Sequence, residues 1–183
     1  MDGPALFTTE GYDVVKNVLG VQARRSLVNQ MFALAKSGMS IKGDGQVKLA
    51  YSFPNPPFEA RLLRIFHSLI EKRSGLKLVQ GHVFGRIYLK GAVLKRHKDR
   101  ELCQCSASLC LGSDDNSIWP LYLRTPIGCD TEILLEPGDM VIFDGFNREH
   151  WREPLVGSWQ AQLFLHYRLQ STSNLDLPYS IDK

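Results

Sequence analysis

The chain has 183 residues, a length that suits one compact domain. Its hydrophobic fraction of 44% and charged fraction of 22% are ordinary for a globular protein that buries a core. The net charge of +3 is not gathered into the basic patch typical of nucleic-acid-binding proteins, and no apolar run reaches the roughly 18 residues that a membrane span needs. The first residues lack a basic segment followed by an apolar one, so we expect no secretory signal and a cytoplasmic protein.

The first 77 residues carry apolar side chains at the three- and four-residue spacing that is typical of amphipathic helices. This spacing occurs at 14–19, 27–35 and 57–73. A Pro-rich segment at 52–57 is predicted to be a loop, because proline interrupts a helix. We therefore expect residues 1–77 to form a mainly helical support.

From residue 78 onward, short runs rich in β-branched and aromatic residues alternate with turns, a texture typical of β-sandwiches and barrels. The predicted strands are 80–89, 92–97, 104–111, 119–124, 131–135, 140–144 and 159–168. Helices followed by strands predict an α+β fold whose N-terminal helices pack on one outer face of the sheets. We expect a single domain over 1–183, with the β core at 78–170 and a C-terminal tail at 171–183.

The four cysteines are Cys103, Cys105, Cys110 and Cys129. On a strand, Cys103 and Cys105 would share one face and Cys110 would lie on the other. This spacing does not resemble a zinc knuckle, in which two ligands usually sit close together on a turn. We expect reduced thiols in the core of a cytoplasmic protein.

His97 and Asp99 are two residues apart, so on a strand both side chains project to the same face. An imidazole nitrogen and a carboxylate oxygen there can take two adjacent positions on a metal ion. A third ligand from a distant strand would complete a facial triad, which leaves positions open and suits non-haem iron(II) oxygenases. The pair alone is a weak signal because His-x-Asp arises often by chance.

The predicted third ligand is His150, which follows the apolar strand at 140–144 and a loop at 145–149. Glu149 and His166 are the alternatives. His67 lies in a helical pattern and His82 begins a strand, and we interpret both as structural or surface residues.

The segment from about residue 80 to 168 resembles the double-stranded β-helix, a jelly-roll or cupin-like core, of the 2-oxoglutarate- and iron(II)-dependent oxygenases. In the prolyl 4-hydroxylase-like branch, a Tyr nine residues before the first metal-binding His faces the cosubstrate, and Tyr88 holds that place here. Pro and Gly soon after the distal His are matched by Pro154 and Gly157. The resemblance therefore implies that His97, Asp99 and His150 bind iron(II).

The first metal strand is also similar to that of AlkB-type demethylases, which reads Asn-x-Tyr-x-x-Gly-x-x-Leu-x-x-His-x-Asp. Its matching residues here are Tyr88, Gly91, Leu94, His97 and Asp99, with Arg86 in the place of Asn. Joint matching at these positions is a stronger signal than His-x-Asp alone.

One position departs from the prolyl hydroxylase pattern. That branch places Lys or Arg about ten residues after the distal His, where this chain has Ser-Trp-Gln at 158–160. The far carboxylate of 2-oxoglutarate needs a charged partner in a partly dry pocket. The candidates are Arg86, which would share a strand face with Tyr88, and Arg168, with Gln162 as a further donor. If neither arginine takes this role, Lys95 or Arg152 is the reserve candidate.

These features predict a 2-oxoglutarate-dependent iron(II) dioxygenase, a hydroxylase that forms succinate and carbon dioxide as co-products. The implied cofactors are Fe(II), 2-oxoglutarate and O2, with ascorbate as a candidate reductant. The favoured substrate is a protein, a peptide or an amino-acid side chain. An AlkB-like nucleic-acid demethylase is the second hypothesis, and a non-enzymatic metal-binding β-barrel is the third.

Overall fold

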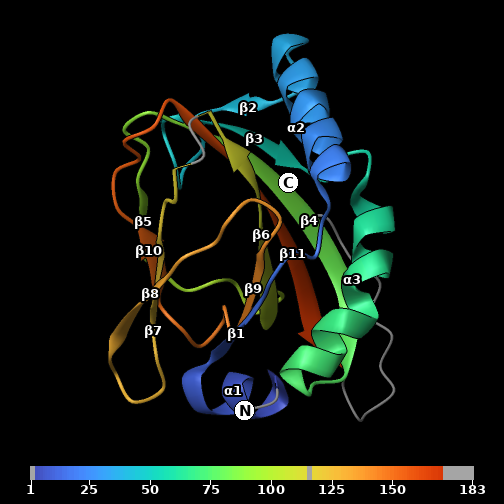
Figure 1. The fold of residues 1–183 in the computed structure, drawn as a ribbon, viewed down its shortest axis with the longest axis vertical. Coiled ribbons are helices and arrows are strands. Elements are labelled where there is room, and N and C mark those ends of the chain that lie inside the picture. Colours follow the sequence, from blue (N-terminus) through green and yellow to red (C-terminus); the bar gives the residue numbers. More distant parts are fainter. Residues whose placement is uncertain (1–2, 115–116, 171–183) are drawn as a thin grey trace.

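The computed structural model describes residues 3–114 and 117–170, so the predicted tail at 171–183 lies outside the described residues. Two antiparallel sheets face each other (Figure 1). In spatial order, the seven-stranded sheet contains β1 (Tyr12–Val15), β9 (Met140–Phe143), β6 (Cys105–Ser113), β11 (Trp159–Leu169), β4 (Leu78–Leu89), β3 (Ala50–Pro54) and β2 (Ile41–Lys42). The four-stranded sheet contains β5 (Leu94–His97), β10 (His150–Arg152), β7 (Leu121–Arg124) and β8 (Asp130–Ile133). The expected α+β fold with a double-stranded β-helix core is confirmed.

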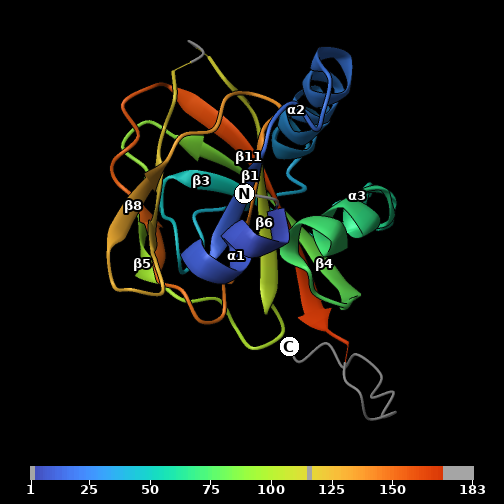
Figure 2. The same ribbon diagram turned by 60° about the horizontal axis from the view of Figure 1, so that its bottom comes forward.

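Three helices accompany the sheets among the described residues: α1 (Gly3–Glu10), α2 (Val21–Lys36) and α3 (Glu59–Ser74). Figures 1 and 2 show α2 and α3 on the side of the large sheet that faces away from the small sheet. Met31 of α2 and Ile70 of α3 are fully buried in one core cluster with Val83 and Leu163 of the sheet. The helices therefore seal one face of the large sheet. None of the helices in the described part of the chain is long and apolar enough to cross a membrane.

The long strands have a two-sided character because successive side chains point to opposite faces. The outward residues Ile87, Leu109 and Leu163 belong to the core beneath the helices. The inward residues are largely polar: Arg86, Tyr88, Ser106, Ser108, Gln160, Gln162 and His166. Burying polar groups in the space between two sheets is costly unless they find partners or ligands, so the inner face marks the functional side.

The N-terminal half contains strands that the helical spacing did not predict. The prediction of a helix at 14–19 is wrong, because Val14 and Val15 belong to β1, which pairs with β9. The prediction of a loop at 52–57 is wrong at its start, because β3 extends to Pro54 and pairs with β4. Both strands lie next to long strands that supply their hydrogen bonds, and this tertiary pairing outweighs local pattern.

The cysteines follow the prediction except at two points. Cys103, Cys105 and Cys110 are buried free thiols, but Cys129 is exposed, so a core position for all four was wrong. Cys105 and Cys110 lie on opposite faces of β6, in separate core clusters. Cys103 precedes the strand, so it does not share a strand face with Cys105.

Helix α3 allows a direct test of the packing. Replacing Ile70, which is 0% exposed, with Ala should lower the free energy of unfolding by about 2–5 kcal/mol, since a buried methyl-rich side chain leaves a cavity. Replacing Ile65 of the same helix, which is 56% exposed, should change it by less than about 1 kcal/mol. Urea unfolding of both variants provides the measurement. Equal losses would show that α3 does not pack as described.

Candidate active site

Three side chains from two segments of the chain converge between the sheets. His97 ends β5, His150 begins β10, and the two residues are paired across the small sheet. Their rings have centroids 4.2 Å apart. Asp99 lies just after β5, and its Oδ1 is 3.8 Å from His97 Nε2 and 3.6 Å from His150 Nε2. The sequence predicted that a strand would position Asp99. Instead, β5 ends at His97, and the Asp99 N–H donates to the Gly145 carbonyl in a loop.

Backbone carbonyls set the orientation of both rings. The Nδ1–H of His97 donates to the carbonyl of Lys95 at 2.8 Å, and that of His150 donates to the carbonyl of Arg148 at 3.1 Å. Each ring therefore directs its Nε2 toward Asp99. Burial, and then the neighbouring His150, lower the pKa of His97, which favours the neutral form of that ring. Such outer hydrogen bonds are typical of metal-binding histidines.

The second oxygen of Asp99 is held from the large sheet. Ser106 Oγ donates to Asp99 Oδ2 at 2.6 Å and accepts from His166 Nδ1 at 3.0 Å. Burial opposes ionisation of Asp99. Hydrogen bonding and charge from His150, with help from His166 and Ser106, outweigh burial and hold the pKa of this carboxyl well below its usual range. Burial lowers the pKa of His166 to about 4, so His166 is neutral. Asp99 is thus a fixed carboxylate with one oxygen directed at the two histidines.

Gly145 is packed against Asp99 without room for a side chain. A Cβ at this position would lie 2.2 Å from Asp99 Oδ2 and 2.7 Å from Ser106 Oγ. Gly145→Ala should therefore displace the carboxylate and weaken divalent-metal binding by about 10–100-fold, the usual effect of disturbing a ligand's supporting contacts. Gly20→Ala, where a Cβ meets nothing within 4 Å, is the control. Calorimetric titration with a divalent metal measures the affinity of both variants. Equal affinities would contradict the close packing of Gly145 against Asp99.

A cavity of about 510 Å³ opens beside the three residues. Tyr88 and Arg86 line it, so both predicted residues face the interior. The amide of Gln46 donates to His97 Nε2 at 2.7 Å. Because this contact uses the lone pair that would bind a metal, Gln46 must turn aside when an ion binds.

Arg86 is already well supplied with partners. Its Nη2 contacts Asp44 Oδ2 at 2.6 Å, its Nε donates to Ser52 at 3.2 Å, and its Nη1 lies 3.0 Å from Gln46 Oε1 and 3.4 Å from the Tyr88 hydroxyl. The Asp44 carboxylate compensates its charge. Arg86 therefore holds the loop at 44–46 over the cavity.

Arg152 is a buried cation with no carboxylate partner among the described residues. It lies in β10 on the same inward side as His150 and is 1% exposed. Its Nη1 donates to the carbonyl of Trp119, but Nε and Nη2 have no hydrogen-bond partner among the described residues. Burial lowers the pKa of Arg152, and the nearby Tyr88 and Cys110 oppose that effect. A buried guanidinium with two unused N–H groups is costly unless a ligand satisfies it.

Two glutamines on β11 complete this inner region. Gln162 accepts from Ser108 at 3.3 Å through Oε1, while its Nε2 has no partner within the described chain. Gln160 contacts the sulfur of Cys110 at 3.8 Å and leaves its Oε1 without one. The predicted donor Gln162 is therefore buried with a free N–H.

The remaining candidates lie elsewhere. Arg168 is half-buried near the end of β11 and is not among the residues that line the cavity. Glu149 forms weak surface ion pairs with Arg96 and Arg124. His166 supports Asp99 through Ser106, and His82, which we interpreted as structural or surface, lines the cavity.

Sequence reasoning missed the role of Ser106 and ranked Arg152 only as a reserve candidate. A signal for Ser106 was present in the alternation of Ser106, Ser108 and Cys110 along one strand face. For Arg152, the signal was its spacing of two residues from His150.

No protein-family model and no curated protein sequence matches the chain. Solved structures do match. A prolyl-4-hydroxylase from Pseudomonas putida superposes with a TM-score of 0.75 at 19% identity, covering 92% of this chain and 98% of that one. A prolyl hydroxylase from Trichoplax adhaerens, in complex with a hypoxia inducible factor peptide fragment, gives 0.74 at 15%, covering 91% and 87%. HygX from Streptomyces hygroscopicus, with nickel and 2-oxoglutarate bound, gives 0.69 at 14%, covering 91% and 86%. The chain thus has the fold of the 2-oxoglutarate- and iron(II)-dependent oxygenases.

Proposed function

We propose that the protein is a 2-oxoglutarate-dependent iron(II) dioxygenase that hydroxylates a C–H bond of a protein, peptide or amino-acid side chain. One observation carries this proposal: His97, Asp99 and His150 place three ligand atoms within 4.8 Å of one another at the wall of the cavity. Two imidazoles and one carboxylate on one side of an ion leave the other positions open, as oxygen-activating iron sites require.

The residues present fit iron(II). His97 and His150 would each donate Nε2, and Asp99 would donate Oδ1. Their other polar atoms are already held by Lys95, Arg148 and Ser106, so the three ligands are oriented before the ion arrives.

The buried region next to Tyr88 offers free donors to a carboxylate. The unused Nε and Nη2 of Arg152 form a fork that matches the two oxygens of a carboxylate. Gln162 Nε2 is a further free donor on β11. We therefore assign the far carboxylate of 2-oxoglutarate to Arg152 and not to Arg86 or Arg168, because Arg86 is neutralised by Asp44 and Arg168 lies near the end of β11, whereas Arg152 lies close to Tyr88.

Bound iron(II) and 2-oxoglutarate together supply the oxidation, in which O2 is consumed, the keto acid becomes succinate and carbon dioxide, and a C–H bond becomes C–OH. The chain's own contribution is orientation and shielding. Arg152 anchors the cosubstrate, Tyr88 flanks it, and Asp99 keeps its charge throughout. The closely packed side chains Phe143 and Leu121 line the same cavity and exclude water.

The proposal is tested by adding iron(II) and 2-oxoglutarate to the metal-free protein without oxygen. Formation of the visible iron-to-ketoacid absorption band, followed by succinate production when oxygen is admitted, is the expected result. A protein that binds iron but produces neither band nor succinate would be a metal-binding β-barrel.

Support for a protein or peptide substrate comes from the two prolyl hydroxylases among the similar structures, one of which holds a peptide. Oxidation of a peptide library, read by a mass increase of one oxygen atom, tests this choice. Release of methyl groups from alkylated nucleic acid, with no oxidised peptide, would instead identify the demethylase activity.

Tyr88 is expected to contact the cosubstrate. It is fully buried, and among the described residues its hydroxyl has only the 3.4 Å contact from Arg86 Nη1. Removing a buried hydrogen bond costs about 1–3 kcal/mol, so Tyr88→Phe should raise the dissociation constant of 2-oxoglutarate about 5- to 150-fold. Tyr122→Phe, a change on the exposed side of the small sheet, should have no effect. Anaerobic titration of the absorption band measures both, and an unchanged constant in Tyr88→Phe would show that this hydroxyl serves only the core.

A further inference from the structure

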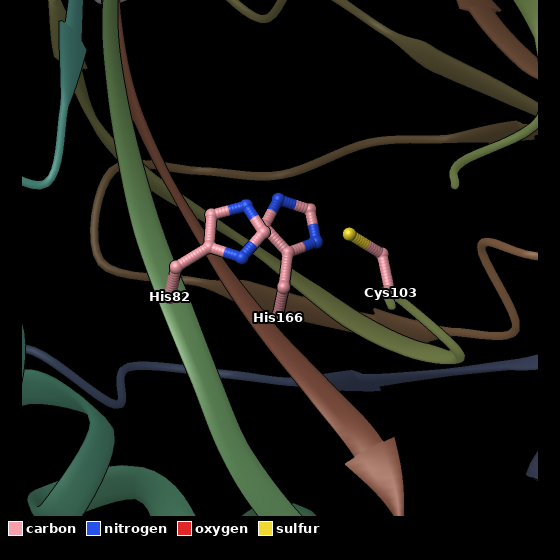
Figure 3. Close-up of side chains that lie close together, drawn as sticks. All are labelled: His82, Cys103 and His166. Atoms are coloured by element: carbon pink, nitrogen blue, oxygen red, sulfur yellow. The ribbon is translucent and has the colours of Figure 1, made fainter. Parts of the chain in front are cut away.

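A second group of metal-binding side chains lies beside the triad. His82, Cys103 and His166 place ligand atoms within 4.8 Å of one another. Figure 3 shows the His82 ring lying against the His166 ring, with the Cys103 sulfur directed toward His166. All three side chains line the cavity described above. None of them belongs to the three residues assigned to iron.

The fold brings these residues together from separate elements. His82 lies on β4 and His166 on the neighbouring β11, and their rings stack with centroids 4.7 Å apart and an interplanar angle of 29°. The ladder between the two strands shifts register between Leu165 and Tyr167. The extra residue lies in β4, where Gly81 and His82 stand opposite His166, and such a bulge re-aims side chains of the bulged strand, here His82. Cys103 lies in the turn before β6, where its N–H donates to the carbonyl of Arg100.

Two imidazoles and one thiol are a donor set with a clear chemical preference. Thiolate is a soft ligand that favours zinc or copper(I) over manganese or magnesium, and imidazole suits the same ions. Three protein ligands with an open fourth position describe a zinc site that can bind water or a substrate group. The half-buried His82 leaves the cluster accessible from the cavity.

We propose that His82, Cys103 and His166 form a second metal site, distinct from the triad, which takes a zinc-type divalent ion with its open position facing the cavity. The proposal concerns metal binding alone and does not depend on the oxygenase activity.

Asp99 lies between the two sites. Its Oδ1 faces His97 and His150, whereas its Oδ2 lies 3.9 Å from His166 Nδ1. This carboxylate favours a cation on either side, while Arg100, which also lines the cavity, opposes one. An ion at the second site would therefore lie beside the triad and occupy part of the cavity through which a ligand reaches His97, Asp99 and His150.

Cobalt(II) provides the test, because it replaces zinc and acquires a strong near-ultraviolet absorption when a thiolate binds it. The full chain, freed of metal, should bind two equivalents, one of them with thiolate absorption. Cys103→Ser should lose that absorption and retain one equivalent. His97→Ala should lose the other equivalent and retain the absorption. Zinc should displace the thiolate-bound cobalt, and manganese should not.

Two further variants keep the test decisive. Cys129→Ser changes an exposed thiol and should leave both equivalents and the absorption intact. His82→Gln retains every thiol and should weaken the thiolate-bound equivalent at least about tenfold, since changes even to supporting groups of a metal site cost about 10–100-fold. A wild-type chain with a single equivalent and no thiolate absorption would overturn the proposal. So would an absorption that survives Cys103→Ser or disappears in Cys129→Ser.

Discussion

Arg152→Met is expected to raise the dissociation constant of 2-oxoglutarate at least about thirtyfold. Removing one partner of a buried charge pair costs about 2–5 kcal/mol, and each 1.4 kcal/mol is a factor of ten. The free energy of unfolding should stay the same or increase, because the substitution removes a buried guanidinium whose Nε and Nη2 have no partner among the described residues. Anaerobic 2-oxoglutarate titration and urea unfolding measure the two quantities.

Arg168→Met is the matched control for this prediction. Arg168 is a half-buried Arg near the end of β11 in the large sheet, and its replacement should leave 2-oxoglutarate affinity unchanged. Iron binding should be retained in both variants. If Arg168→Met weakens 2-oxoglutarate binding and Arg152→Met does not, the far carboxylate lies at the other end of the barrel and the assignment to Arg152 is wrong.

Asp99→Ala is expected to abolish turnover and to weaken iron(II) binding by at least about a hundredfold. Asp99 provides the only anionic ligand of the triad, and changing a group that merely supports a metal ligand already costs about 10–100-fold. Metal titration and succinate formation measure the effect.

Glu149→Ala is the control for Asp99→Ala. Glu149 is a half-buried carboxylate next to His150, and its ion pairs among the described residues are at 3.8 and 3.9 Å. Its loss should leave both metal affinity and turnover intact. Retention of iron binding and succinate formation in Asp99→Ala would show that the three residues do not act as one metal centre.

His97 and Asp99, two of the three residues proposed to bind the metal, could be predicted because their signal is local. They are two residues apart, so they are close in space in any extended segment, although a loop contact to Gly145 sets the final position of Asp99. The same period of two put Arg86 and Tyr88 on the inner face of β4 before any tertiary contact was known. The helices at 27–35 and 57–73 were predictable for a similar reason, since an apolar stripe is a property of one segment.

Other features depend on which strands become neighbours. Val14 and Val15 form a strand because they pair with the edge of β9. In this pairing Val15 lies opposite Met140, which is 125 residues later in the chain. Ser106 contacts Asp99 because the start of β6 lies next to the loop after β5, and His82 contacts His166 because β4 and β11 are paired. The spacing of residues within one segment does not predict these contacts.

The sequence by itself determined the α+β texture, the inward face of the long strands and the three residues suited to iron. Only the tertiary structure decided which arginine stands without an anion, since Arg86 is neutralised by Asp44 from a distant loop and Arg152 is not. Whether a buried charge keeps a partner depends on every element packed around it, whereas side-chain direction along a strand depends only on the backbone of that strand.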